Sequence, residues 1–166
     1  MHAFEFYQPT AITFGPGAEG QVGEKAAQLG AGRVLVVYGG QSAKRSGLLD
    51  RVLDSLKGAG LTSETFGGIH PNPRLFQARD GVAKALEFGA DLILAVGGGS
   101  VIDAAKAIAL GAANPEADLW DFWLKKLPVE HILPVGVVLT ISASGSETSD
   151  TALLTRDDTL EKRGLG

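Results

Sequence analysis

Apolar runs that end in glycine-rich loops are the feature that most narrows the folds open to this chain. Residues 33–38 and 91–96 are mostly apolar runs rich in β-branched side chains, and they lead into glycines at 39–40 and 97–99. Such runs are typical of parallel strands buried on both faces of a sheet. A third apolar run, at 133–139, leads into a segment rich in serine and threonine. We therefore expect ligand-binding loops at the carboxyl ends of these strands.

The stretches between these runs carry apolar residues at the spacing of a helix. The expected helices are residues 18–29, 48–57, 74–88 and 101–113, and a short strand is expected at 62–66. Strands that alternate with helices of this length pair in parallel through right-handed crossovers. The sequence thus predicts an α/β fold with a Rossmann-like, doubly wound parallel sheet.

Shorter elements are expected near both ends of the chain. Residues 4–7 and 11–14 flank Pro9 and are expected to form an N-terminal β-hairpin at a sheet edge, where proline is tolerated. Residues 151–155 are expected to form a return strand, and the charged residues after them to be irregular. The aromatic segment 120–123 is expected to cap the core; alternatively, it forms a surface for another domain or subunit.

Composition argues against several classes of function. The 166 residues carry a net charge of −4 without a basic stripe, which argues against nucleic acid and membrane surfaces as partners. The absence of cysteine excludes disulfides, thiolate metal sites and a cysteine nucleophile. We expect no signal peptide and no membrane-spanning segment, which needs roughly 20 apolar residues. These features predict a single-domain cytoplasmic protein.

The loop formed by Gly97, Gly98, Gly99 and Ser100 is the strongest candidate for a ligand site. It joins an expected buried strand directly to an expected helix, whose free N–H groups and partial positive charge suit a pyrophosphate. We expect Ser100 to be the N-cap and Asp103, three residues later, to complete a capping box. The alternative is that the glycines only allow a tight turn, although three in succession exceed what a turn needs.

Two further loops lie at the same expected edge of the sheet, at 39–42 and 67–73. The first follows the first buried strand but lacks the G-x-G-x-x-G pattern of the common dinucleotide fingerprint. The second contains two prolines, which restrict its backbone.

Four segments resemble the iron-dependent (group III) alcohol dehydrogenases, specifically their butanol dehydrogenase-like branch. They are Phe14-Gly15-Pro16-Gly17, the loop at 67–73, the run from Ala95 to Lys106, and Leu139 to Glu147. The resemblance covers nearly the whole chain in the correct order. It implies an oxidoreductase that transfers a hydride between a nicotinamide dinucleotide and a primary alcohol or aldehyde.

The resemblance also implies the positions of cofactor-binding residues. The pyrophosphate is expected on Gly97, Gly98, Gly99 and Ser100, with Asp103 close to the cofactor. Asn72 matches a family residue near the adenosine side, and Thr140 and Ser144 match hydroxyls that contact the nucleotide. Lys162 resembles the family's lysine near the nicotinamide ribose.

The loop after the first buried strand bears on the choice between NADP and NAD. Relatives that prefer NAD tend to carry an aspartate there, which binds the ribose 2′-hydroxyl and repels a 2′-phosphate. This chain has Gly39, Gly40 and Ser42 instead, followed closely by Lys44 and Arg45. We therefore expect NADP rather than NAD; the two cations also fit an ordinary solvated helix start.

The resemblance places the family's metal, iron or zinc or another divalent ion, in a second, helical domain. Its ligands are an aspartate and a histidine one helical turn apart and two later histidines, and no such set occurs among His2, His70 and His131. Because the metal stabilises the alkoxide, we expect residues 1–166 to act as a truncated dinucleotide-binding domain with little or no turnover alone.

Three other interpretations remain open from the sequence. Maleylacetate reductases, glycerol dehydrogenases and dehydroquinate synthases share a related N-terminal fold. A stand-alone nucleotide-binding module without catalysis would also carry these loops. An exposed cleft reused for homo-oligomerisation is the third interpretation.

Overall fold

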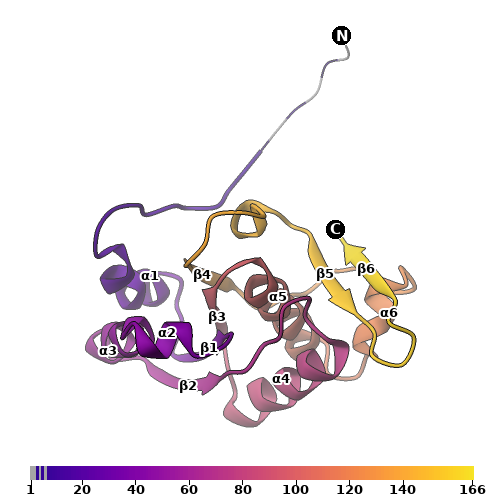
Figure 1. Cartoon of the computed structure of the whole chain (residues 1–166), viewed down its shortest axis with the longest axis horizontal. Helices are drawn as coiled ribbons and strands as arrows, with labels where there is room; N and C mark the ends of the chain where they lie inside the picture. The colour runs from indigo at the N-terminus through magenta and orange to yellow at the C-terminus, as the bar shows by residue number, and fades with distance from the viewer. Residues whose placement is uncertain (1–2, 4, 6) are drawn as a thin grey trace.

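The computed structural model describes residue 3, residue 5 and residues 7–166. Its centre is a parallel sheet (Figure 1), which has four strands. The strand order is β2-β1-β3-β4. The strands are β1 (Arg33–Tyr38), β2 (Thr62–Phe66), β3 (Leu92–Gly97) and β4 (Val135–Leu139). In register, Val36 lies opposite Leu94 between β1 and β3, and Ala95 lies opposite Val137 between β3 and β4. The predicted parallel sheet is confirmed.

Helices cover both faces of this sheet. They are η1 (Ala18–Gln21), α1 (Val22–Gln28), α2 (Ser42–Arg45), α3 (Leu48–Gly58), α4 (Leu75–Phe88), α5 (Gly99–Ala113), α6 (Leu119–Trp123) and η2 (Ser146–Thr148). On one face, α1 and α3 pack on alternate strand residues such as Val36 and Leu94. On the other face, α4 and α5 pack on the intervening residues such as Val37 and Ala95. Because both faces of β1 and β3 are covered by helices, these strands appear in the sequence as nearly continuous apolar runs.

A separate antiparallel hairpin lies beside α5 and α6 (Figure 1). It consists of β5 (Ala152–Thr155) and β6 (Lys162–Leu165). The expectation of irregular chain after residue 155 was therefore wrong. Leu154 and Leu165 of the hairpin join a third apolar cluster, so burial of a few side chains orders an otherwise charged segment.

The aromatic segment lies in α6, and it caps the core as expected. Trp120, Phe122 and Trp123 are each no more than 3% exposed and pack against the hairpin. The alternative, an open aromatic surface, was wrong because β5 and β6 cover these rings.

The predicted N-terminal hairpin is not found among the residues that the structure describes. Residues 11–14 contain no strand, and Phe14 is fully exposed. Of the other predicted strand, residues 4 and 6 lie outside the described residues, and residues 5 and 7 are not in a strand. A two-stranded ribbon is only marginally stable unless it packs on something. Residues 7–14 are exposed throughout, so no such packing supports a hairpin here.

Within the described residues, no helix has both the length and the apolar character needed to cross a bilayer.

Asp118 caps α6, and its removal provides a test of this part of the core. Its carboxylate accepts a hydrogen bond from the Trp120 N–H and lies 2.8 Å from a guanidinium nitrogen of Arg79. Partial burial opposes ionisation, but these two hydrogen bonds outweigh it and hold the pKa of Asp118 below its ordinary value. We expect Asp118→Ala to lower the free energy of unfolding by about 1 kcal/mol at neutral pH.

The pH dependence of this effect has a definite sign. Because the folded-state pKa is lowered, the contribution of Asp118 is complete above the ordinary pKa of an aspartate and is lost as the pH falls through the folded-state pKa. Urea unfolding should therefore show the gap between wild type and variant closing below about pH 4. Asp54→Ala, at an exposed position of α3, is the matched control. A gap that stays constant down to pH 3 would contradict this role.

Candidate functional site

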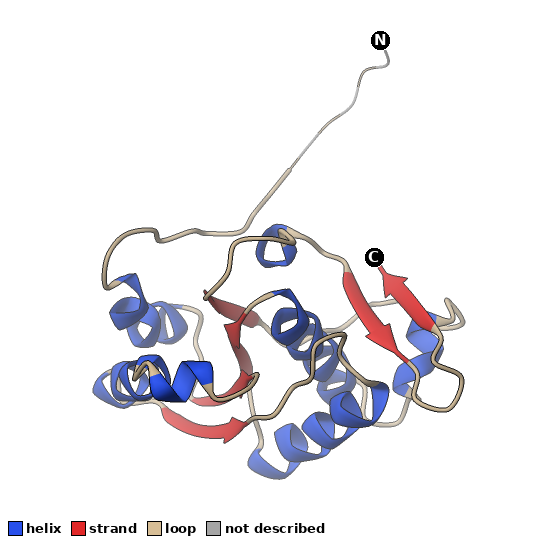
Figure 2. Ribbon diagram, viewed as in Figure 1, coloured by secondary structure: helices blue, strands red, loops and turns tan. Residues whose placement is uncertain are grey.

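The carboxyl ends of β1, β3 and β4 meet at one edge of the sheet, where α5 begins (Figure 2). The Thr140 N–H donates to the carbonyl of Gly97 at 3.0 Å, which joins the loops after β3 and β4. The Gly68 N–H donates to the carbonyl of Gly39 at 3.0 Å, which joins the loops after β1 and β2. All three glycine- or serine-rich loops predicted from the sequence therefore lie along this edge.

The turn from β3 to α5 differs from the sequence prediction in its cap. The N-cap is Gly98, with an extended backbone, and the helix begins at Gly99. Ser100 is therefore inside the first turn, and the predicted Ser100–Asp103 capping box was wrong. The amides of Gly99 and Ser100 have no hydrogen-bond acceptor among the described residues. Two free N–H groups thus stand at the positive end of a 15-residue helix, which is an arrangement suited to an anion.

The glycines of this turn are required for different reasons. A Cβ on Gly97 would lie 2.6 Å from a methyl carbon of Val101, and a Cβ on Gly99 would lie 2.4 Å from the hydroxyl of Ser144. Packing against Val101 therefore excludes a side chain at Gly97, whereas a side chain at Gly99 would require the exposed Ser144 to move. A Cβ on Gly98 would meet nothing closer than the Cβ of Ile141, at 3.9 Å. Only Gly98 thus faces space that a ligand could use.

Asn72 joins its own loop to the start of α5 and to strand β6. Its N–H donates to the Ser100 hydroxyl at 3.1 Å, and its side-chain oxygen accepts from the Lys162 ammonium at 2.7 Å. Asn72 has a φ of 55°, a left-handed conformation that asparagine adopts more readily than most residues. Sequence reasoning named all three residues separately, and the structure brings them into one hydrogen-bonded group.

Gln77 holds the loop at 67–73, and sequence reasoning missed it. It is buried in α4, donates to the carbonyl of Gly68 at 2.7 Å and accepts from the N–H of His70 at 3.2 Å. A buried polar residue must find partners, and here both are backbone groups of the loop. The signal in the sequence was a glutamine among the apolar positions of an amphipathic helix.

Asp103 and Lys106 lie one turn apart on α5 and both contact the loop after β4. The Ser146 hydroxyl donates to Asp103 at 2.7 Å, and Lys106 donates to the carbonyl of Ser146 at 2.7 Å. Burial lowers the pKa of Lys106, although nearby carboxylates, including Asp103, oppose this effect. Sequence reasoning gave Lys106 no role, because its partners lie about 40 residues further along the chain.

The loop after β1 contains the remaining predicted site residues. Gly39 lies against Val101, since its Cβ would stand 3.2 Å from a methyl carbon, whereas Gly40 borders open space. Ser42 is exposed in the short helix α2. No backbone hydrogen bond among the described residues joins Gly40 or Ser42 to Gly98, and we place these two residues at the margin of the group.

The Lys44 side chain is held near this margin by an aromatic ring. Its ammonium lies 5.1 Å from the ring centroid of Tyr38, at the end of β1. The Tyr38 ring in turn packs against Gly67, where a Cβ would lie 2.1 Å from the ring carbon Cζ. This cation–π contact places a positive charge at the ends of β1 and β2.

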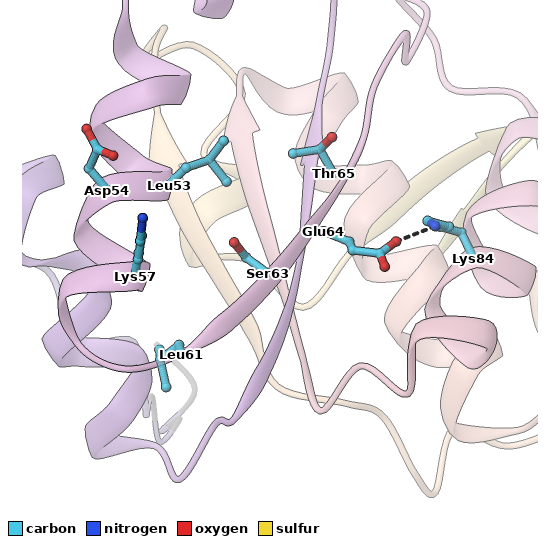
Figure 3. A pocket seen from close by; sticks show the side chains of 8 residues that line it. All are labelled: Leu53, Asp54, Lys57, Leu61, Ser63, Glu64, Thr65 and Lys84. Atoms are coloured by element: carbon cyan, nitrogen blue, oxygen red, sulfur yellow. Dashed lines mark ion pairs between the residues drawn. The ribbon is translucent and has the colours of Figure 1, made fainter.

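A separate hollow lies at the free edge of β2 (Figure 3). It has a volume of about 570 Å³ and is lined by residues from α3, β2 and α4, including the ion pair of Glu64 with Lys84. None of the predicted site residues lines it. This hollow is an open surface groove. The loops that converge at the carboxyl ends of the strands form the stronger candidate site.

The described part of the chain does not supply a metal centre. No three histidine, aspartate or glutamate side chains gather there in a way that could hold an ion. The donors present therefore do not fit the iron or zinc site that the resemblance places in a second domain.

Comparison with known proteins identifies relatives of this chain. Residues 9–166 match the model of a family described as "Iron-containing alcohol dehydrogenase". The chain is 45% identical over 166 residues to a probable NADH-dependent butanol dehydrogenase of Bacillus subtilis, and 40% identical over 167 residues to the NADPH-dependent aldehyde reductase YqhD of Escherichia coli. These matches cover 100% and 99% of the chain but only 42% of either relative.

A solved structure shows the same backbone. The NADH-dependent butanol dehydrogenase A of Thermotoga maritima superposes with a TM-score of 0.97 at 42% identity, over 100% of this chain and 42% of that protein. The chain thus spans less than half the length of the relatives it matches. The resemblance inferred from the four sequence segments is confirmed, and the chain belongs to the iron-containing alcohol dehydrogenase family.

Proposed function

We propose that residues 1–166 form the dinucleotide-binding domain of an NADP-dependent alcohol or aldehyde oxidoreductase. The observation that carries this proposal is the turn at Gly98. It combines free amides at the start of a long helix with open space where a side chain would stand. A pyrophosphate needs both features, because its oxygens must approach the backbone closely.

Each predicted residue has a distinct task in this proposal. The amides of Gly99 and Ser100 bind the pyrophosphate, while Gly98 lets it approach. The resemblance implied Asn72 near the adenosine and Lys162 near the nicotinamide ribose, but their hydrogen bond of 2.7 Å brings both to one place. We therefore propose that both hold the nucleotide from the side of the β5–β6 hairpin, and that this bond keeps them in place before binding. The exposed hydroxyls of Thr140 and Ser144 contact the nucleotide from the loop after β4. When bound, the nicotinamide supplies or accepts the hydride.

The preference for NADP rests on the loop after β1. It presents Gly39, Gly40 and Ser42 and no carboxylate that would repel a 2′-phosphate. Lys44, held over the Tyr38 ring, adds a positive charge nearby. The names of the relatives include both an NADH-dependent and an NADPH-dependent enzyme, so cofactor choice varies among proteins this similar.

Titration of the purified chain with NADPH and NADH, followed by cofactor fluorescence, tests the proposal. We expect saturable binding of both, with NADPH at least about tenfold tighter, because a 2′-phosphate meets cations rather than a carboxylate. Tighter binding of NADH would retain the site and overturn the choice of NADP. Binding of neither cofactor would overturn the proposal for this chain.

A substitution at Lys44 tests the source of the selectivity. We expect Lys44→Met to weaken NADPH binding about fivefold and to leave NADH binding unchanged, because only the 2′-phosphate senses the lost charge. Arg45→Met removes a neighbouring charge that has no ring contact among the described residues, and we expect less than a twofold change. Equal weakening of both cofactors by Lys44→Met would contradict this role for its charge.

We also propose that the 166 residues alone do not catalyse turnover. Hydride transfer from an alcohol requires stabilisation of the developing alkoxide, and the described residues offer no group that could hold a metal for this purpose. Incubation with a primary alcohol, NADP and a divalent metal should give no increase in cofactor absorbance. Chelator-sensitive reduction of NADP by the purified chain would overturn the proposal.

A further inference from the structure

Lys106 spans the gap between α5 and the loop that follows β4. Its ammonium nitrogen lies 2.7 Å from the carbonyl oxygen of Ser146, 2.7 Å from that of Ser149 and 2.8 Å from that of Thr151. The hydroxyl of Ser146 lies at 3.1 Å. An ammonium has only three protons. These four acceptors therefore occupy all three protons of Lys106, and no proton is left to donate to a phosphate.

A second side chain fastens the same loop from the preceding turn of α5. Asp103 is 9% exposed and accepts the Ser146 hydroxyl proton at 2.7 Å. Residues three apart on a helix lie on one face, so Asp103 and Lys106 approach the loop side by side. Ser146 is thus held at both its carbonyl and its hydroxyl.

The fastened loop is the one that packs on the glycine turn. Ser144, two residues before Ser146, fills the space beside Gly99, where a Cβ would lie 2.4 Å from its hydroxyl. The loop continues through Thr151 into β5, whose partner strand β6 carries Lys162. The ammonium of Lys106 therefore holds one segment, which packs on the glycine turn through Ser144 and leads into the hairpin after Thr151.

Exposed lysines are seldom held in one geometry, but Lys106 is half-buried and surrounded by backbone carbonyls. Burial lowers its pKa, and the carboxylates of Asp103, Asp150 and Glu147 oppose this shift. Because three carbonyl oxygens and a hydroxyl surround its ammonium, Lys106 acts here as a hydrogen-bond donor to the loop. A neutral side chain of similar length would leave these carbonyls without their donor.

We propose that Lys106 is a positioning residue, which holds the segment 144–151 against α5 and so sets the location of Ser144 beside the Gly98 turn. This inference rests on the proposed function for the identity of the ligand. The loop-holding role itself does not depend on which ligand binds. Lys106 does not contact the nucleotide directly in this proposal, because it has no proton free to donate to a phosphate.

The test compares Lys106→Met and Lys106→Arg with Lys57→Met, a control at an exposed position of α3. Amide hydrogen exchange reports on the loop, and NADPH titration reports on the site. We expect Lys106→Met to speed exchange in 144–151 at least about tenfold and to weaken NADPH binding about tenfold, with β1 and β3 as protected as in wild type. Lys106→Arg, which keeps the charge and several donors, should recover both values to within about threefold.

If residues 144–151 of Lys106→Met exchange their amide protons at the wild-type rate, the proposal is overturned. It is also overturned if exchange there becomes faster but NADPH binds with wild-type affinity. Equal defects in the Met and Arg variants would also overturn it. If Lys106→Met loses protection in β1 and β3, Ser146→Ala replaces it, and there we expect faster exchange confined to the loop. If the wild type binds neither cofactor, the proposed function fails, and exchange alone still decides whether Lys106 holds the loop.

Discussion

Trp123→Ala should lower the free energy of unfolding by about 3–5 kcal/mol, the largest effect of any single substitution considered for this chain. Trp123 is 1% exposed and is among the largest fully buried side chains. Its indole N–H donates to the carbonyl of Ala152 at 3.2 Å, so its removal leaves both a cavity and a buried carbonyl without its donor. For a chain of this size the melting temperature should fall by roughly 6–20 °C.

The same substitution should also weaken cofactor binding, although Trp123 is not part of the candidate site. Its ring packs in α6 against the β5–β6 hairpin, and β6 carries the Lys162 that pairs with Asn72. We therefore expect weaker NADPH binding even at temperatures where the variant remains folded.

Two controls separate the causes of this destabilisation. Leu86→Ala removes a large apolar side chain that is 45% exposed, and it should cost well under half as much. Trp123→Phe keeps an aromatic ring but loses the N–H donor, and it should lie between wild type and Trp123→Ala. A Trp123→Ala variant that melts within 2 °C of wild type would show that α6 does not anchor the hairpin.

The sheet could be predicted from sequence because each of its inner strands carries its own signal. Residues 34–38 are buried on both faces, and the resulting apolar run, which follows the exposed Arg33, is bounded by glycines at 32 and 39. The hairpin at the end of the chain carries no such signal. The four residues of β6 include Lys162 and Arg163, and their order depends on Leu165 reaching a cluster formed by α6. Such an element is stabilised by tertiary contacts rather than by its own pattern.

The candidate site could likewise be predicted only where neighbouring residues in the sequence carry the signal. The glycine turn was predicted because a strand, a turn and a helix start are contiguous in the chain. The N-cap was predicted two residues too late, because glycine at 98 and 99 permits both an extended cap and a helical start. The role of Lys106 could not be predicted, since all its acceptors come from residues 146–151.

The structure also changes the interpretation of the three consecutive glycines. From sequence, all three are assigned to close approach of a phosphate. In the fold, Val101 excludes a side chain at Gly97, and a side chain at Gly99 would require Ser144 to move. Substitutions at these two positions would disturb the protein whether or not a nucleotide binds. Gly98 is the position where a substitution reports on the ligand alone.

Gly98→Ala should weaken NADPH binding about 30–100-fold without lowering the melting temperature. Gly98 has φ −97° and ψ −168°, which any residue can adopt, and its Cβ would stand 3.9 Å from the nearest atom. The fold therefore tolerates alanine. A pyrophosphate bound to the amides of Gly99 and Ser100 would be displaced by the added methyl group and would lose charge-assisted hydrogen bonds.

The comparison of three glycine variants makes the test specific. Gly58→Ala adds a methyl group in open space at the end of α3, far along the chain from the turn, and we expect wild-type binding and stability. Gly99→Ala should lower both stability and binding, because its methyl group collides with Ser144. Only Gly98→Ala should weaken NADPH binding while leaving stability unchanged. If it binds NADPH as tightly as wild type, the cofactor does not lie on this turn, and the free amides of α5 serve only to begin a helix.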